Sequence, residues 1–338
     1  MPEDKFDIDY TVVVFTYNPD EKILSRCLNA ISNLDLRDTN TEFLLIDNNS
    51  STPVGNHLYV QDYLKKIPSI TITYVKEQGL QYARIAAIEQ AKGKYLIFFD
   101  YDNEPDTLYI QELKNLNMLY PHVGAWGPGN VDVNFLGTID KRMEAYARTT
   151  FQERHDKEIA FADIKEWQSC YPYGSGLCMY LPLLKKYVAL VDAGILTLPG
   201  RKGAALTSGE DTQMVLLCIK EGYSAGVSPG LKLTHIIPAN RNNSKYLQKL
   251  TYSTSSCYYT CMMQVFPEYK TTLEQIIISP GKFSRQAIKK LIRAKSQPDP
   301  EQMFNYIFFI GINAGVYFAL EIPLPLVVKK TIQYLKIA

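Results

Sequence analysis

Short apolar strands that alternate with helical patterns are the feature of this chain that most constrains its fold. The strand candidates are β-branched or aromatic runs at residues 10–16 (YTVVVFT), 42–46 (EFLLI), 70–75 and 95–99 (YLIFF). Such runs are typical of strands buried on both faces. Apolar residues at helical spacing follow over 23–34, and a second helix is predicted for about 80–92. This alternation predicts an α/β fold with a mostly parallel sheet flanked by helices.

Polar residues stand directly after three of these strands. They are Thr16-Tyr17-Asn18, Asp47-Asn48-Asn49 and Asp100-Tyr101-Asp102. In open α/β sheets, ligands bind beyond the carboxyl ends of the strands, near the point where the strand order reverses. We therefore expect the three polar tips to converge on one binding crevice.

The third tip carries two carboxylates, Asp100 and Asp102, one residue apart. Two such groups repel each other unless a cation or a proton relieves them. Hard divalent cations prefer oxygen ligands and often bridge to substrate phosphates. The tip is thus a candidate metal site, and the alternative is an ordinary solvated turn.

A second acidic pair, Glu210-Asp211, precedes a helix predicted to run to Glu221, with Gly222 beyond its end. Acidic residues in a first helical turn cap free N–H groups and suit the helix dipole, which is the structural interpretation. The functional interpretation is a general base held at the mouth of a helix.

His235 and Arg84 each have two interpretations. His235 lies among apolar neighbours in LTHIIP and is either a hydrogen-bonded core residue or a neutral imidazole ligand to a metal. Arg84 is either a surface charge on a helix or a side chain that reaches a phosphate or a base edge.

Charge divides the chain into two regions. Residues 241–338 hold 13 Lys and Arg against 5 Asp and Glu, whereas residues 1–240 hold 23 against 30. We therefore predict a catalytic domain over 1–240 and a basic helical region over 241–338. The formal net charge of +1 argues against a nucleic-acid binder coated with basic residues.

The C-terminal region contains two candidate membrane-contacting segments. Residues 282–295 (KFSRQAIKKLIRAK) have six basic residues and no acid, and they predict a basic amphipathic helix. Residues 303–320 are uncharged but short for a membrane span. We expect peripheral attachment through 282–338, with 303–320 as an interfacial or re-entrant hairpin. The alternatives are an ordinary solvated helix and a buried helical pair packed on the catalytic domain.

Taken together, the motifs resemble family 2 glycosyltransferases of the GT-A fold. VVVFTYNPDEKILSRCLNAI resembles that family's first strand, Thr-Tyr-Asn turn and helix, and EFLLIDNNSST its second strand and polar tip. EQGLQYARIAAIEQAKGKYLIFFDYD is similar to its Ala-Arg helix and the strand that ends in Asp-x-Asp. SGEDTQM resembles its Glu-Asp motif, and LKLTHIIP its late strand with histidine. The order and spacing of five motifs over about residues 10–240 make the resemblance specific.

The resemblance implies a role for each matching residue. Asp211 would be the general base, and Glu210 would orient the acceptor or the donor sugar. Mn2+ or Mg2+ would be bound by Asp102, with His235 and Asp100 as further candidate ligands. The residues that would hold the nucleotide-sugar are Thr16, Tyr17, Asn18, Asp47, Arg84, Asp100 and Tyr101. The acceptor groove would be bordered by Trp167, Gly174 and Gly176.

The activity implied is inverting transfer of a hexosyl or N-acetylhexosaminyl group. The donor would be a nucleotide-diphosphate sugar, expected to be UDP-linked, and the acceptor a hydroxyl of a glycan or lipid-linked glycan, as in surface polysaccharide assembly. The sequence departs from the family pattern at Tyr101, Asn103 and Ile85, where a small or acidic residue, a third acid and Asn are common. These departures bear on the geometry of the metal site but leave both outer carboxylates in place.

Two other functions remain as alternatives. A non-catalytic sugar-nucleotide-binding or membrane scaffold protein could share this fold, although it would not need the four carboxylates. A sugar nucleotidyltransferase normally has a Gly-rich loop after its first strand, where this chain has Thr16-Tyr17-Asn18-Pro19. The acidic N-terminus lacks an apolar run and the six cysteines lack CxxC spacing. We therefore expect reduced thiols and a cytoplasmic location, either free or attached peripherally to the inner face of the cell membrane.

Overall fold

The computed structural model describes residues 6–67, 69–197, 206, 209–297 and 299–338. The chain forms two compact units, and each is discontinuous in sequence. The sheet unit comprises Met1–Asn134, Glu153–Ile195 and Met214–Ile236. The helical unit comprises Phe135–Gln152, Leu196–Gln213 and Ile237–Ala338. The change of unit after Ile236 lies close to the predicted boundary at 240, but two earlier segments also cluster with the C-terminal helices.

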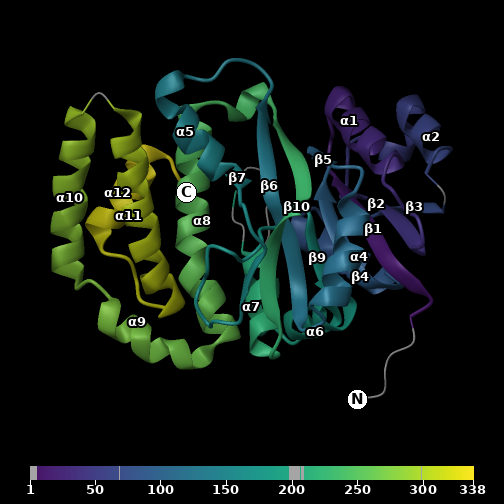
Figure 1. Ribbon diagram of the computed structural model, residues 1–338. Helices are drawn as coiled ribbons and strands as arrows, with labels where there is room; N and C mark the ends of the chain where they lie inside the picture. The colour runs from purple at the N-terminus through teal and green to yellow at the C-terminus, as the bar shows by residue number, and fades with distance from the viewer. Residues whose placement is uncertain (1–5, 68, 198–205, 207–208, 298) are drawn as a thin grey trace. The chain divides into compact units, whose positions relative to one another are not determined.

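A single mixed sheet forms the centre of the sheet unit (Figure 1). Its strands are β1 (Ile8–Thr16), β2 (Thr41–Asp47), β3 (Ile70–Tyr74), β4 (Gly93–Asp100), β5 (Asn103–Pro105), β6 (Val123–Phe135), β7 (Arg154–His155), β8 (Ala160–Ala162), β9 (Leu177–Tyr180) and β10 (Ser224–Ile237). The order is β3-β2-β1-β4-β9-β6-β10-β5, with β7 on β6 and β8 on β10. The strands β3, β2, β1 and β4 are parallel, as expected, whereas β9 pairs antiparallel with β4 and β6, and β5 with β10.

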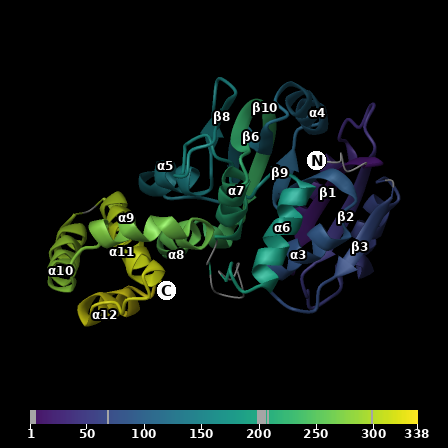
Figure 2. The same ribbon diagram turned by 90° about the horizontal axis from the view of Figure 1, so that it is seen from below.

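Helices cover both faces of the parallel strands. They are α1 (Glu21–Ser32), α2 (Leu58–Leu64), α3 (Leu80–Gln90), α4 (Tyr109–Leu119) and α6 (Leu181–Asp192). Side chains alternate along each strand, so Val12 and Val14 of β1 join Leu24 and Leu28 of α1 in one core cluster. On the other face, α3 packs against β1 and β2 and beside α6, as Figure 2 shows. The α/β fold class predicted from the sequence is confirmed.

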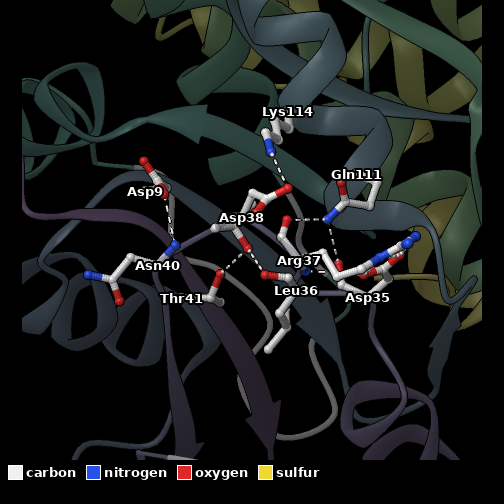
Figure 3. A network of polar contacts seen from close by, with 10 residues as sticks. Asp9, Asp35, Leu36, Arg37, Asp38, Asn40, Thr41, Gln111 and Lys114 are labelled. Carbon is white, nitrogen blue, oxygen red and sulfur yellow. Dashed lines mark hydrogen bonds and ion pairs between the residues drawn. The ribbon is translucent and has the colours of Figure 1, made fainter.

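The α1–β2 loop is held at the amino ends of the parallel strands (Figure 3). The backbone N–H of Asn40 donates to Asp9 Oδ2 at 2.8 Å, which joins the start of β2 to the start of β1. From α4, Gln111 Nε2 donates to the carbonyls of Asp35 (3.1 Å) and Arg37 (2.9 Å). These bonds fix α4 to the end of the sheet that is opposite the polar tips.

The helical unit contains α5 (Lys141–Thr150), α8 (Ser244–Val265), α9 (Lys270–Ile276), α10 (Pro280–Ser296), α11 (Pro300–Ala319) and α12 (Leu326–Leu335). One further helix, α7 (Glu210–Lys220), begins in this unit and continues into the sheet unit. Short 3-10 turns occur at Val54–Asn56, Ala239–Arg241 and Pro267–Tyr269. Within the unit, α11 lies between α8 and α10 in both views (Figure 1, Figure 2).

The uncharged segment 303–320 is therefore a packed helix rather than an interfacial or re-entrant hairpin. Gly311 and Gly315 of α11 face α8 so closely that a Cβ at Gly315 would lie 2.8 Å from the Ser256 carbonyl oxygen. Residues such as Phe304, Ile307 and Ile310 are buried in the same helix. Among the described residues, no helix is long and apolar enough to cross a membrane.

Candidate active site

The tips of β1 and β2 are joined by hydrogen bonds between their loops. Thr16 and Asp47 are opposite each other in the parallel register, and both are buried. The Asn18 N–H donates to Ser50 Oγ and the Ser51 N–H donates to Asn18 Oδ1, each at 2.8 Å. Two of the predicted nucleotide-binding tips are thus one connected structure, while Tyr17 beside them is 42% exposed.

Asp47 uses both carboxylate oxygens to shape this loop. Its Oδ1 accepts from the Ser50 N–H at 2.9 Å, and its Oδ2 accepts from the Val54 N–H at 2.7 Å. Its side chain therefore has a structural role whatever it does for a ligand, because a buried carboxylate needs such donors.

Asn48 links the second tip to the start of α3. Its Nδ2 donates to the Glu77 carbonyl at 2.9 Å, and its Oδ1 accepts from the Gly79 N–H at 2.7 Å. Further along α3, the guanidinium of Arg84 lies 5.8 Å from the centroid of the Phe98 ring and is 3% exposed. Arg84 is therefore a buried cation beside β4, not a surface charge.

The Asp100–Asp102 turn is organised by Asn103. The Asn103 Oδ1 accepts from the Asp100 N–H, and its Nδ2 donates to Asp102 Oδ1, both at 3.1 Å. The Tyr101 N–H donates to the Phe15 carbonyl of β1 at 3.1 Å. Asn103 is completely buried, and its hydrogen bond orients the Asp102 carboxylate. Asn103, one of the residues that depart from the family pattern, is thus an integral part of the turn.

Strand pairing brings His235 to Asp102. His235 on β10 pairs with Asn103 on β5, and the Ile236 N–H donates to the Asp102 carbonyl at 2.8 Å. The His235 Nε2 lies 3.8 Å from Asp102 Oδ1, and the two residues are 9% and 3% exposed. Two predicted metal ligands from distant parts of the sequence therefore meet at one point.

This pair fits a divalent cation. Ligand atoms bound to one ion at about 2.1 Å each can be at most about 4.2 Å apart, and carboxylate oxygen with imidazole nitrogen is a common donor set. The separation of 3.8 Å is within this limit and is too long for a direct hydrogen bond. Over the described ranges, no cluster of three or more His, Cys, Asp or Glu side chains has the arrangement of a metal site.

The residues predicted to border the acceptor differ in their surroundings. The Trp167 and Tyr173 ring centroids are 5.8 Å apart, and Tyr173 is 40% exposed. Gly176 is buried with φ +73°, and a Cβ there would lie 2.6 Å from Tyr109 Oη and 2.8 Å from Leu233 Cδ2. The glycine is thus required by packing, and the Trp167 ring lies beside the exposed Tyr173 ring.

Glu210 and Asp211 begin α7 within the helical unit. Glu210 is completely buried and its Oε2 accepts from the Gly209 N–H at 2.9 Å, whereas Asp211 is half-buried and its Oδ1 accepts from the Thr212 N–H at 2.8 Å. This arrangement combines the capping expected of acidic residues at a helix start with a partly accessible carboxylate.

Helix α8 of the same unit contacts the residues at the start of α7. The Cys261 Sγ donates to the Gly209 carbonyl at 3.4 Å, and Gln264 Oε1 accepts from Gln213 Nε2 at 2.6 Å. Burial, followed by the nearby Cys257, Asp211 and Glu210, raises the pKa of the Cys261 thiol well above its usual range. Sequence reasoning missed Cys261 and Gln264, because they lie in a region that carries none of the motifs.

Comparison with known proteins finds a family match over part of the chain. Residues 11–166 match glycosyl transferase family 2. None of the curated protein sequences matches the chain.

Solved structures resemble the chain at low sequence identity. GalNAc-T7 with UDP, GalNAc and Mn2+ is 16% identical, with a TM-score of 0.50 over 78% of this chain and 52% of that one. This chain therefore spans about half of GalNAc-T7. S. aureus TarS 1–349 is 13% identical, with a TM-score of 0.46 over 93% of this chain and 91% of that one. The family match confirms the resemblance to family 2 glycosyltransferases over residues 11–166, the segment that carries the three strand tips, the Asp-x-Asp turn among them.

Proposed function

We propose that this protein is an inverting, metal-dependent glycosyltransferase that moves a hexosyl or N-acetylhexosaminyl group from a UDP-sugar to a glycan or lipid-linked glycan hydroxyl. The single observation that carries the proposal is the approach of His235 to Asp102 at the end of the Asp-x-Asp turn. A carboxylate and an imidazole at this distance suit a cation that also binds a diphosphate.

The donor would lie across the polar tips of β1, β2 and β4. Thr16, Tyr17, Asn18 and Asp47 would hold the base, Asp100 and Tyr101 would lie near the ribose and the sugar, and Arg84 would lie near the diphosphate. An arginine held in one place by burial can form charge-assisted hydrogen bonds with phosphate oxygens. GalNAc-T7 was solved with UDP, GalNAc and Mn2+, and we propose the same classes of nucleotide and cation here, with Mg2+ as the other candidate ion.

Sugar–phosphate cleavage determines what the protein must supply. Negative charge builds up on the leaving diphosphate, and a cation bound by Asp102 and His235, with Asp100 as a further candidate, would offset it. Asp211 would take the proton of the acceptor hydroxyl as that oxygen attacks the anomeric carbon, with Glu210 orienting a sugar beside it. The carbon–oxygen bond to the diphosphate breaks as the new bond forms from the opposite face. One displacement therefore inverts the anomeric configuration.

The acceptor would lie beside Trp167, Gly174 and Gly176. The exposed Tyr173 ring beside Trp167 supports this assignment, because aromatic faces give a sugar ring an apolar surface to contact. A lipid-linked acceptor would suit a cytoplasmic enzyme attached to the inner face of a membrane, with a role in polysaccharide assembly.

A panel of nucleotide sugars with Mn2+ or Mg2+ tests the proposal, with release of nucleoside diphosphate in the presence of candidate acceptors as the readout. Turnover of one UDP-sugar that stops when EDTA is added is the expected result. Binding of nucleotide sugars without release of diphosphate under any combination would instead favour the non-catalytic binding protein.

A further inference from the structure

Helix α10 of the helical unit exposes a dense row of cations. Its basic residues are Lys282, Arg285, Lys289, Lys290, Arg293 and Lys295, all exposed, and the helix contains no Asp or Glu. Within the described residues, none of these six side chains forms an ion pair. No carboxylate of the described residues therefore neutralises the positive charge of α10, although Lys290 lies 4.6 Å from the Phe309 ring centroid.

Apolar side chains stand among these cations on the outer face. The inner face of α10 is buried through Phe283 and Ala287, and the Phe283 ring contacts Phe309 and Tyr317 of α11. Ile288 and Ile292 lie one helical turn apart and are 48% and 65% exposed. The two isoleucines therefore place an exposed apolar pair among the cations of this helix.

Helix α12 continues this surface. Lys295 at the end of α10 donates to the Tyr334 hydroxyl and lies 4.3 Å from its ring centroid. On α12, Leu326 and Tyr334 are 65% and 63% exposed, and the basic residues of 326–336 (Lys329, Lys330 and Lys336) have no acidic neighbour in that segment. The two helices, with Lys336 directly after α12, thus present exposed apolar residues and nine cations, and neither helix contains a carboxylate.

We propose that the outer face of α10 and α12 binds the surface of an anionic phospholipid bilayer. Charge complementarity identifies the partner as an anion, and the exposed Ile288, Ile292 and Leu326 select a bilayer over a soluble polyanion, which offers no apolar phase. Tyr334 suits the same interface, because its ring is apolar and its hydroxyl is polar.

Flotation of the full-length protein with vesicles tests this surface. The protein is expected to float with phosphatidylglycerol–phosphatidylcholine vesicles and to remain at the bottom of the gradient with pure phosphatidylcholine vesicles. Its binding to the anionic vesicles should weaken as the salt concentration rises. Failure to float with the anionic vesicles, or equal flotation with both kinds, would overturn the proposal.

Matched variants separate the apolar contribution to vesicle binding from the electrostatic contribution. Ile288→Ser/Ile292→Ser should weaken vesicle binding at least about tenfold, whereas Met118→Ser/Leu119→Ser, which removes two exposed apolar residues from α4, should leave it unchanged. Arg285→Glu/Lys289→Glu should abolish binding, and the same charge change in Lys92→Glu/Lys94→Glu should preserve most of it. Wild-type flotation of the isoleucine variant, with soluble polyphosphate as an effective competitor, would identify a polyanion partner and contradict the bilayer.

Discussion

The His235 Nε2 lies 3.8 Å from the Asp102 Oδ1, although the two residues are far apart in the sequence. The antiparallel pairing of β5 with β10 produces this approach, because His235 pairs with Asn103, the residue after Asp102. Asn103 in turn donates to the same Asp102 oxygen. Under the proposed function, this carboxylate and imidazole would act as a preorganised pair of cation ligands.

Asp102→Asn is expected to weaken Mn2+-dependent binding of UDP by about 10–100-fold or more, because the neutral amide is a poor ligand for a hard cation. Titration calorimetry with and without Mn2+ measures this effect. Asp132→Asn, an exposed carboxylate on β6 of the same unit, is the control and should bind normally. Equal affinity of the wild type with and without Mn2+ would contradict the metal role.

Gly176→Ala is expected to destabilise the protein by about 1–3 kcal/mol more than Gly222→Ala, because only Gly176 meets atoms within contact distance. Both glycines have positive φ (+73° and +84°), but a Cβ at Gly222 meets nothing within 4 Å. Urea unfolding of the two variants measures the difference. Equal stabilities would show that Tyr109 and Leu233 move aside at no cost.

Asp47→Ala is expected to cost about 1–3 kcal/mol of folding free energy, because the N–H groups of Ser50 and Val54 lose their acceptors. Asp47→Asn keeps one acceptor oxygen and should recover part of that loss. Unfolding of both variants in the absence of nucleotide is the measurement. If both variants unfold like the wild type, Asp47 has no structural role and acts on a ligand alone.

Buried thiols predict a loss of stability at alkaline pH. Burial raises the pKa of Cys178 above its usual range. The unfolded chain therefore releases this proton first, above the ordinary thiol pKa of about 8.5. The stabilisation is complete below that pH and declines as pH rises toward the folded value.

Cys178→Ala should reduce the slope of unfolding free energy against pH, measured from about pH 9 to 10.5, by up to about 1.4 kcal/mol per pH unit. Cys170→Ala, at a half-buried thiol, is the control and should change the slope less. An unchanged slope in Cys178→Ala would mean that this thiol ionises equally in both states.

The parallel half of the sheet could be predicted from the sequence because its signals are local. The strands β1, β2 and β4 are continuous apolar runs, and α1 shows the 3.6-residue spacing that buries Leu24, Cys27 and Leu28. Each polar tip then follows directly from where an apolar run stops.

The antiparallel half could not be predicted in the same way. The strand β6 contains Trp126-Gly127-Pro128-Gly129, which has the composition of a loop. These glycines are required by close packing, since a Cβ on Gly127 would lie 2.4 Å from Pro172 Cβ and one on Gly129 would lie 2.7 Å from the Ser228 backbone. The need for glycine at these positions comes from residues that are distant in the chain, so it produces no periodic pattern in the sequence of β6.

The candidate site likewise combines features that the sequence predicts with features that depend on the folded geometry. The Asp-x-Asp turn and the Glu210-Asp211 helix start could be located from sequence, whereas the function of Asn103 as the support of Asp102 could not, because it depends on the geometry of the turn. Likewise, the uncharged segment of α11 has the composition of an interfacial helix, but its glycines and apolar residues are used for packing against α8 and α10.

The most direct test of the central claim is the turnover of Asp211→Asn with the UDP-sugar and acceptor that the wild type uses. Loss of the general base should reduce the rate about 10²–10⁴-fold, or about 3–5 kcal/mol of barrier, while UDP binding by calorimetry stays at the wild-type level. Turnover at the wild-type rate in Asp211→Asn would contradict the assigned base and, with it, the proposed mechanism.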